Sequence, residues 1–168
     1  MIVCVDVDYR ESCGVAALVA IPKWDSDTDA ATLVVRIEGA PPPYVPGAFY
    51  RRELPYLTRV IDAARDRGIR PTVVVVDGYA WLGPSVKGLG AHLSEALAGT
   101  PVIGVAKTPY RASAPVTVEV IRGGSTTPLF VTAAGIDTKE AGAHVQVMHG
   151  AHRIPTMLRR VDRAAREG

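Results

Sequence analysis

The sequence lacks several features that mark well-known classes of protein. Its 168 residues include only two cysteines, Cys4 and Cys13, so that a disulfide framework is excluded. The two thiols can form one bridge at most, and reduced thiols are the favoured interpretation. No apolar run approaches the roughly 20 residues of a membrane span, and the first residues predict a strand rather than a signal peptide. We therefore expect a cytoplasmic protein with no membrane partner.

The chain also lacks the glycine-rich fingerprint of dinucleotide-binding proteins after its first predicted strand, which disfavours a nucleotide-binding enzyme of the Rossmann type. It has no internal repeat and no low-complexity linker. Hydrophobic residues make up 48% and charged residues 21%, which is typical of a folded chain. At this length we expect a single domain, residues 1–168, with a full hydrophobic core.

The net charge of +2 conceals an uneven distribution. Residues 1–40 hold three basic and seven acidic side chains, a local charge of −4. Residues 51–70 hold six arginines against three acids, and residues 153–168 hold five arginines against two acids, so that each segment is locally +3. Such segments are either a phosphate-binding face or solvated helix surfaces, and charge alone slightly favours the second interpretation.

Hydrophobic periodicity predicts an α/β fold. Four consecutive valines, residues 73–76, are typical of a strand that is buried on both faces at the centre of a parallel sheet. Residues 2–9 alternate, which predicts a strand with Asp6 on the opposite face from its valines. The predicted elements, in order, are strands at 2–9, 13–21 and 32–37, a helix that opens near Glu53 and ends at Gly68, a strand at 73–76, a helix at about 85–98, a strand at 100–106, a hairpin of strands at 116–121 and 128–133, and two helices, one from about 137 to 150 and one after Pro155.

This order is that of a ribonuclease-H-like domain. We therefore expect an α/β protein with a ribonuclease-H-like mixed sheet, in which three antiparallel strands are followed by parallel strands. Helices flank the sheet, and a C-terminal hairpin and helices complete it. In such a sheet the first and fourth strands are neighbours, so that Asp6 and Asp77 would face one another across the ladder.

Four ionisable residues fall where one site could form. Asp77 ends the central strand, where open α/β sheets place their ligands, and Gly78 after it permits a sharp turn. Glu53 opens the first helix, and Lys107 ends the adjacent parallel strand. Each residue alone has a structural explanation, such as a helix charge or a solvated amine. Their coincidence with Asp6 makes a shared catalytic site the better hypothesis.

The chemistry of these residues points to a metal-dependent site. Close carboxylates repel one another strongly unless a cation lies between them. Mg²⁺, with Mn²⁺ as a substitute, prefers oxygen ligands and keeps waters that substrate phosphates displace. One or two such ions held by Asp6, Glu53 and Asp77 can activate water and stabilise the leaving oxygen of a phosphodiester. Lys107 would orient the water or neutralise charge on the scissile phosphate.

Several short motifs are distributed along nearly the whole chain. Two of them are specific, Pro43-Tyr44-Val45-Pro46-Gly47 and Gly104-Val105-Ala106-Lys107. The others agree in order: Val5-Asp6-Val7, Arg52-Glu53, Asp77-Gly78 and Pro128-Leu129-Phe130. Together the motifs resemble the endonuclease V family of deoxyinosine-directed nucleases, over nearly the whole chain. The resemblance implies a metal-dependent endonuclease of DNA repair. It would recognise hypoxanthine in DNA and nick one strand on the 3′ side, at the second phosphodiester.

The resemblance also implies roles for single residues. Asp6, Glu53 and Asp77 match the family's metal and catalytic carboxylates, and Lys107 matches its lysine. Tyr44 is implied as a wedge that parts the strands, and a rigid wedge suits base flipping, which costs a few kcal/mol. The residues implied to bind the substrate, in the wedge loop and around the flipped base, are Pro43, Tyr44, Val45, Pro46, Phe49, Gly78, Gly88 and Gly104.

The sequence departs from the family where the substrate would be read. The family's His-Pro-Arg-Arg stretch is absent, and the corresponding segment of this sequence contains Tyr79 and Trp81. A family histidine expected after Gly135 is replaced by Ile136. The alternative is therefore a ribonuclease-H-like nucleic-acid-binding protein with weak or altered nuclease activity, for example on inosine-containing RNA, in which Tyr44, Tyr79 and Trp81 stack on bases. In either case we expect nucleic acid as the partner, and a monomer.

Overall fold

The computed structural model describes residues 1–43, 45 and 48–168. Its elements, in order, are β1 (Ile2–Tyr9), β2 (Cys13–Ile21), β3 (Ala31–Glu38), α1 (Tyr50–Asp66), β4 (Val73–Asp77), β5 (Trp81–Gly83), β6 (Val86–Lys87), α2 (Leu89–Ala96), β7 (Val102–Ala106), a short 3-10 helix η1 (Arg111–Val116), β8 (Val118–Val120), β9 (Leu129–Ala134), α3 (Thr138–Val147) and α4 (Thr156–Glu167).

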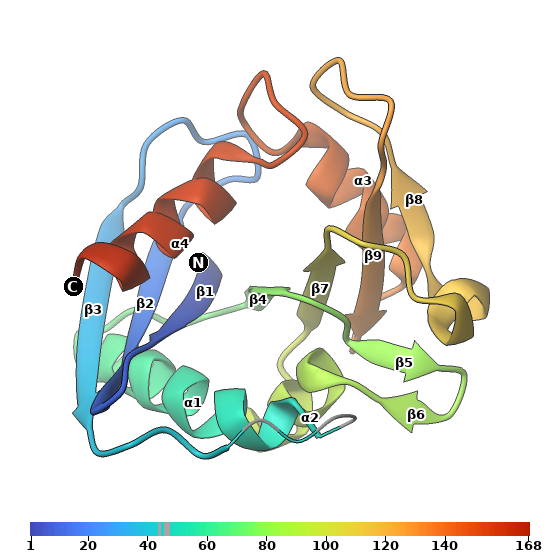
Figure 1. Ribbon diagram of the computed structural model, residues 1–168. Helices are drawn as coiled ribbons and strands as arrows, with labels where there is room; N and C mark the ends of the chain where they lie inside the picture. Colours follow the sequence, from blue (N-terminus) through green and yellow to red (C-terminus); the bar gives the residue numbers. More distant parts are fainter. Residues whose placement is uncertain (44, 46–47) are drawn as a thin grey trace.

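Seven strands form one mixed sheet, in the order β3-β2-β1-β4-β7-β9-β8 (Figure 1). Strands β1, β2 and β3 form an antiparallel meander, β4 and β7 run parallel to β1, and β9 returns antiparallel to β7 and β8. The predicted fold class, a mixed sheet of antiparallel and then parallel strands flanked by helices, is confirmed.

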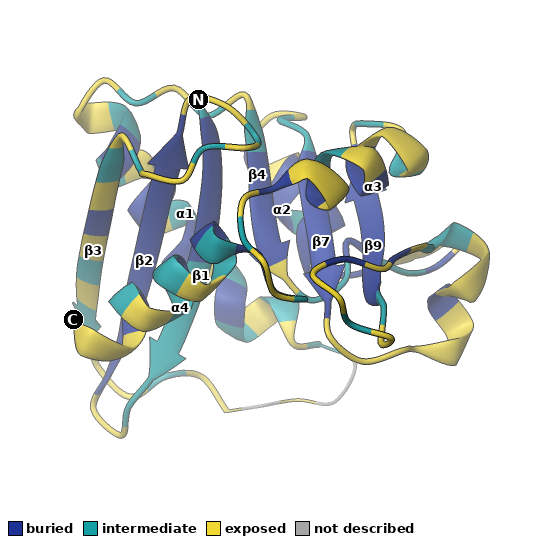
Figure 2. Ribbon diagram, turned by 90° about the horizontal axis from the view of Figure 1, so that it is seen from above, coloured by how far each residue is buried: buried dark blue, intermediate teal, exposed yellow. Residues whose placement is uncertain are grey.

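Two pairs of helices cover the two faces of this sheet (Figure 1). Helices α1 and α2 pack on the face that carries Val74 and Val76, and α3 and α4 pack on the face that carries Val75. These three valines are at most 1% exposed, which confirms the predicted burial on both faces (Figure 2). Full burial of one such side chain contributes about 1.5 kcal/mol or more, so that β4 anchors the centre of the fold.

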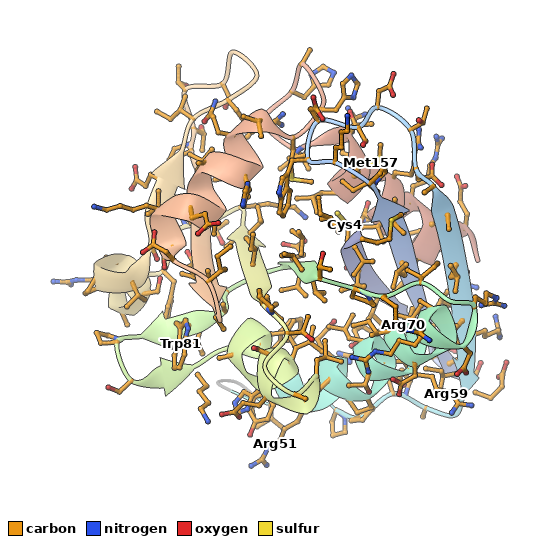
Figure 3. All side chains as sticks on the ribbon, turned by 180° about the vertical axis from the view of Figure 1, so that it is seen from behind. Cys4, Arg51, Arg59, Arg70, Trp81 and Met157 are labelled. Atoms are coloured by element: carbon orange, nitrogen blue, oxygen red, sulfur yellow. The ribbon has the colours of Figure 1, made fainter. Side chains whose placement is uncertain are left out.

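Both cysteines are buried free thiols, as predicted. Cys4 lies in the core beneath α4, in the same cluster as Met157 (Figure 3). Burial raises the pKa of the Cys4 thiol to about 12, so that its reactive thiolate form is scarce near neutral pH. Among the described residues, no helix has the length and apolar character needed to cross a membrane.

The structure corrects the predicted helix at 85–98. Helix α2 begins only at Leu89, and the residues before it form a small hairpin, β5–β6. The reason lies at Gly88, whose backbone N–H donates to the carbonyl of Ala80 at 2.9 Å. A Cβ at Gly88 would lie 2.5 Å from the Tyr79 carbonyl oxygen, so that the chain is held there in extended form by a segment eight residues back.

The predicted strand at 116–121 is also shorter than expected. Strand β8 covers Val118–Val120 only, because the residues before it form the 3-10 helix that contains Pro115. Proline has no backbone N–H to donate to a sheet, which ends the ladder at this point.

Candidate active site

Parallel strand ends bring two predicted acidic residues to one edge of the sheet. Strands β1 and β4 pair with Val5 opposite Val76, so that the next residues, Asp6 and Asp77, leave the ladder at the same level. Gly78 has a φ of 107°, a left-handed conformation that favours glycine, and it turns the chain away from the sheet. The side chain of Asp77 is thus left at the carboxyl end of a central strand.

Glu53 reaches the same edge from the first turn of α1. Its side chain is buried, at 6% exposure, and the Tyr9 hydroxyl donates a hydrogen bond to Glu53 Oε1 at 2.7 Å. The positive end of the helix dipole also favours a carboxylate at this position. The hydrogen bond therefore directs the Glu53 side chain from α1 toward the end of β1.

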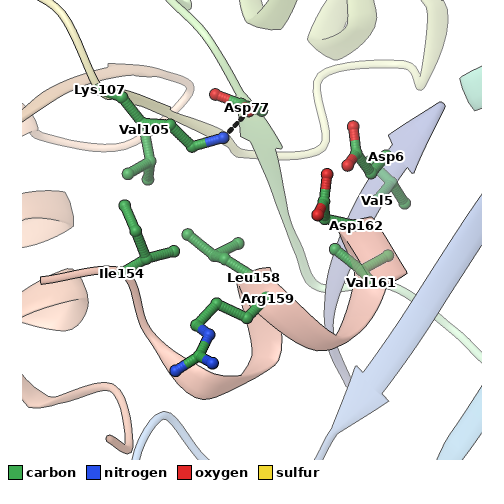
Figure 4. Close-up of a pocket in the computed structure, with 10 residues that line it drawn as sticks. All are labelled: Val5, Asp6, Asp77, Val105, Lys107, Ile154, Leu158, Arg159, Val161 and Asp162. Atoms are coloured by element: carbon green, nitrogen blue, oxygen red, sulfur yellow. Dashed lines mark hydrogen bonds and ion pairs between the residues drawn. The ribbon is translucent and has the colours of Figure 1, made fainter. Parts of the chain in front are cut away.

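One cavity of about 440 Å³ collects all four predicted catalytic residues. Its lining residues include Asp6, Glu53, Asp77 and Lys107, together with Tyr9, Phe49, Arg52, Gly78, Asp162 and Arg166. A second cavity, of about 150 Å³, shares part of this lining and extends beneath α4 toward Leu158 and Ile154 (Figure 4). The structure therefore brings the predicted residues together, and their catalytic roles stay a prediction.

Two carboxylates of the larger cavity, the partly buried Asp6 and the buried Glu53, hold their protons unusually tightly. Burial raises the pKa of Asp6 to about 7; the backbone N–H of Val7, which donates to Asp6 Oδ1 at 2.9 Å, opposes this shift, and Asp77 adds to it. Burial likewise raises the pKa of Glu53 to about 7, against the hydrogen bond from Tyr9, and the charge of Asp6 adds to the rise. A cation between these groups would favour their charged forms.

Asp77 is in a different environment. Its side chain is 44% exposed, and its carboxylate accepts a hydrogen bond from Lys107 Nζ, which turns it away from Asp6 (Figure 4). Within the described part of the chain, no three acidic, histidine or cysteine side chains surround one ion position in this arrangement. Exposed side chains change rotamer within nanoseconds, so that a turn of Asp77 toward Asp6 requires no change in the backbone.

Asp162, on α4, is a carboxylate that the sequence analysis missed. It lies opposite Asp6, lines both cavities and contributes to the raised pKa of Asp6 (Figure 4). Arg166, one turn further along α4, donates to Asp162 Oδ1 from Nη2 at 2.9 Å and from Nε at 3.1 Å. The only signal in the sequence was an acid within an arginine-rich segment, which does not reveal where the helix packs.

The glycines predicted to shape a base pocket have different surroundings. Gly78 lies on the larger cavity, as does Phe49. A Cβ at Gly104 would instead lie 2.5 Å from the backbone nitrogen of Ala80 and 2.6 Å from the carbonyl oxygen of Gly78. Like Gly88, Gly104 therefore lets the segment after Asp77 pack closely against the sheet. Direct contact between these two glycines and a base stays a prediction.

The predicted wedge loop is described only in part. Tyr44 and Pro46 lie outside the described residues, whereas Pro43 and Val45 are exposed, Val45 by 46%. Their contact with a substrate stays a prediction.

Tyr79 and Trp81 are anchored to the fold. The Tyr79 hydroxyl donates to the carbonyl of Thr108 at 2.8 Å, and Trp81 Nε1 donates to the carbonyl of Ala133 at 2.9 Å. Trp81 also packs against a small apolar cluster that includes Ala80. These two aromatic residues therefore stabilise the segment that follows Asp77.

Comparison with known proteins gives one consistent result. The sequence model of the family described as Endonuclease V matches residues 1–154. The chain is 34% identical to the Endonuclease V of Streptomyces avermitilis in an alignment of 186 positions. The alignment covers 96% of this chain and 77% of that protein. It is 32% identical to the Endonuclease V of Streptomyces coelicolor, with 96% and 76% covered.

Solved structures agree with this result. The crystal structure of the Streptomyces avermitilis Endonuclease V matches with a TM-score of 0.72 and 29% identity, over 99% of this chain and 79% of that chain. The structure of Ciona intestinalis Endonuclease V, in complex with a DNA that contains an inosine followed by a ribo-adenosine, matches with a TM-score of 0.82 over 99% of this chain and 83% of that chain. At 16% identity, this second likeness is one of fold.

Proposed function

This chain belongs to the endonuclease V family, and on that premise we propose that it cleaves DNA on the 3′ side of hypoxanthine, at the second phosphodiester, with Mg²⁺ as its cation. Membership of the family makes it an endonuclease. The observation that carries the finer assignment is the meeting of five carboxylates, two from β1 and one each from α1, β4 and α4, with Lys107 in one cavity. The inosine-containing DNA bound by the Ciona intestinalis relative supports hypoxanthine as the base.

The residues present fit a divalent cation. Glu53 is buried and Asp6 partly buried, and their raised pKa values express the free-energy cost of removing their charge from water, which a bound cation would offset. Asp6, Asp77 and Glu53 would hold the ion, since carboxylate oxygens are the hard ligands that Mg²⁺ prefers. When bound, such an ion promotes the ionisation of water and stabilises charge on a leaving oxygen.

The chain itself supplies positive charge for the substrate. The Lys107 side chain is 48% exposed, and its ammonium is free to move to the scissile phosphate once Asp77 turns toward a cation. Arg52 lines the same cavity and suits a phosphate oxygen, because guanidinium groups bind phosphate through paired hydrogen bonds. Glu53 is the most enclosed of the acidic groups, and it would hold the attacking water.

The two arginine-rich segments contribute less to binding than their charge indicates. On α4, Arg160 pairs with Asp29, and Arg163 with Glu167. In the other segment, the exposed residues Arg51 and Arg59 lie on α1, and the exposed Arg70 lies beyond its end (Figure 3). This favours solvated helix surfaces, with Arg52 as the arginine of α1 that lines the larger cavity.

A cleavage assay tests the proposal. A DNA duplex with one hypoxanthine and a 5′ label on the same strand is incubated with the protein and Mg²⁺. We expect a nick at the second phosphodiester on the 3′ side, identified by the length of the labelled product. A duplex with adenine at that position is the substrate control, and Asp77→Asn is the protein control. Equal cleavage of both duplexes, or cleavage that survives Asp77→Asn, would contradict the proposal.

The alternative, a nucleic-acid-binding protein with weak or altered nuclease activity, receives less support. It depends in part on stacking of bases on Tyr79 and Trp81, whose polar atoms are engaged with the backbone of Thr108 and Ala133. The same assay with DNA and RNA versions of the strand separates the two functions, because the 2′-OH is the group by which a protein distinguishes them. Binding of both strands without cleavage, or cleavage of RNA alone, would favour the alternative.

A further inference from the structure

We propose that Tyr9 is a positioning residue that holds two neighbouring side chains of α1, Glu53 and Arg52, against the catalytic cavity. The inference rests on the proposed function of that cavity. Tyr9 is the last residue of β1, on the strand that carries Asp6, and it lines the cavity itself. It therefore joins a strand of the site to the helix that contributes the other two residues.

The first contact is between the Tyr9 hydroxyl and the Glu53 carboxylate. The hydroxyl donates to Glu53 Oε1 at 2.7 Å, and this is the one hydrogen bond to the Glu53 side chain within the described residues. Because Glu53 is only 6% exposed, few waters can replace the hydroxyl if it is removed. A hydrogen bond to a charged group in such a place contributes more than an ordinary one and fixes the rotamer of the carboxylate.

The second contact is between the Tyr9 ring and the Arg52 guanidinium. Arg52 Cζ lies 3.9 Å from the centroid of the ring, in cation–π contact. Arg52 Nε is buried and has no hydrogen-bond partner within the described residues. The flat face of Tyr9, rather than a hydrogen bond at Nε, therefore orients this guanidinium at the cavity.

The Tyr9 ring is itself held firmly. Tyr56 packs against it edge-on, with ring centroids 5.5 Å apart and planes at 88°. Tyr56 in turn occupies the space above Gly14 on β2, where a Cβ would lie only 2.7 Å from Tyr56 Cζ. A glycine on β2, a tyrosine on α1 and the end of β1 thus fix the position of the ring, and through it the positions of Glu53 and Arg52.

Two substitutions separate the two contacts, because each contact uses a different part of the side chain. Tyr9→Phe removes the hydroxyl and keeps the ring, so that it affects Glu53 alone. Tyr9→Leu removes both and also affects Arg52. Tyr50→Phe is the matched control: Tyr50 is a tyrosine of α1 that stacks on His92, with centroids 3.6 Å apart, and it does not line the catalytic cavity.

The Glu53 contact is tested by Mn²⁺ binding and by turnover. We expect Tyr9→Phe to weaken Mn²⁺ binding, measured by titration calorimetry, by about 10-fold and to lower kcat by about 10-fold, since groups that orient a metal ligand typically contribute 10- to 100-fold. KM for the hypoxanthine duplex should stay within about twofold of wild type, a split that general loosening of the fold would not produce. Thermal unfolding of each variant serves as the check on folding.

The Arg52 contact is tested by DNA affinity and its salt dependence, in EDTA and without cleavage. We expect Tyr9→Leu to weaken binding of the duplex by about 5-fold and to lower the slope of log Kd against log salt by about 1, the loss of one phosphate contact. Tyr9→Phe and Tyr50→Phe should leave both quantities unchanged.

The possible results are distinguishable. Equal Mn²⁺ affinity in wild type and Tyr9→Phe overturns the role toward Glu53, as does a wild type that binds no Mn²⁺. Equal salt slopes for the Phe and Leu variants overturn the role toward Arg52. A wild type that binds Mn²⁺ and DNA but does not cut at hypoxanthine refutes the proposed function alone, since the two binding measurements still decide the role of Tyr9.

Discussion

The four predicted catalytic residues of the larger cavity form two halves that differ in burial: Asp6 and Glu53 are the buried half, and Asp77 and Lys107 are the exposed half. Glu53 is buried and Asp6 partly buried, and each carboxylate accepts a hydrogen bond, Glu53 from the Tyr9 hydroxyl and Asp6 from the Val7 backbone N–H. Asp77 and Lys107 are about half exposed and form an ion pair with each other. Exposed ion pairs contribute only about 0–1 kcal/mol, so that this second half rearranges at little cost. The comparison indicates that the buried half supplies fixed geometry and the exposed half supplies adjustable charge.

The largest expected effect concerns the buried half. Asp6→Asn should reduce cleavage about 1,000-fold, because it removes a charged ligand from an enclosed site. The same substitution should raise the free energy of unfolding in EDTA at pH 8 by about 1 kcal/mol or more, since a partly desolvated charge is lost. Single-turnover cleavage and urea unfolding measure the two quantities. Asp77→Asn, in the exposed half, should lose cleavage without gaining stability. Equal changes in the free energy of unfolding of Asp6→Asn and Asp77→Asn would contradict the difference in burial between the two halves.

The next effect concerns the ammonium of the exposed half. Lys107→Met should lower kcat about 100-fold, because the charge of the scissile phosphate loses a neutralising partner. The free energy of unfolding should change by less than about 0.5 kcal/mol. Lys87→Met is the control, since Lys87 forms an ion pair with Glu95 at similar exposure and does not line either cavity. A large loss of stability in Lys107→Met would show that this half is not adjustable.

The pH dependence of stability sharpens the comparison further. Asp6 and Glu53 titrate near pH 7 when folded, against ordinary values of 3.8 and 4.5, so that the folded state binds more protons than the unfolded state between about pH 4 and 7. The free energy of unfolding in EDTA should therefore fall as pH rises through this window, by several kcal/mol from these two groups together. Urea unfolding at several pH values, compared with Asp6→Asn, measures the difference. If the free energy of unfolding of wild type rose relative to that of Asp6→Asn as pH increased, the assigned desolvation of Asp6 would be contradicted.

The smallest expected effect lies outside both halves. Trp81→Phe removes the hydrogen bond to the carbonyl of Ala133 and should lower the free energy of unfolding by about 1 kcal/mol. Cleavage of the hypoxanthine duplex should stay within about twofold of wild type, because the anchored ring supports the segment after Asp77 rather than the substrate. A loss of DNA affinity in this variant without a loss of stability would indicate that Trp81 contacts the DNA.

Local patterns predicted much of the fold. The bounds of β1 and β2 are as predicted from alternation and apolar runs, and α4 follows Pro155 as expected. The prediction was wrong for residues 85–88, because their conformation depends on the backbone of Ala80 and not on their own side chains. Hydrophobic periodicity does not reveal a conformation that is set by close contact with the backbone of another segment.

The sequence by itself determined that Asp77 and Lys107 stand at the ends of neighbouring parallel strands and that Asp6 lies within β1, beside the end of β4, because the expected strand order brings these positions together. Only the tertiary structure decided that Asp162 joins them and that Tyr9 holds Glu53 and Arg52, since these contacts come from a helix on each face of the sheet. Hydrophobic pattern shows which face of a helix is buried, but not which strand it is buried against.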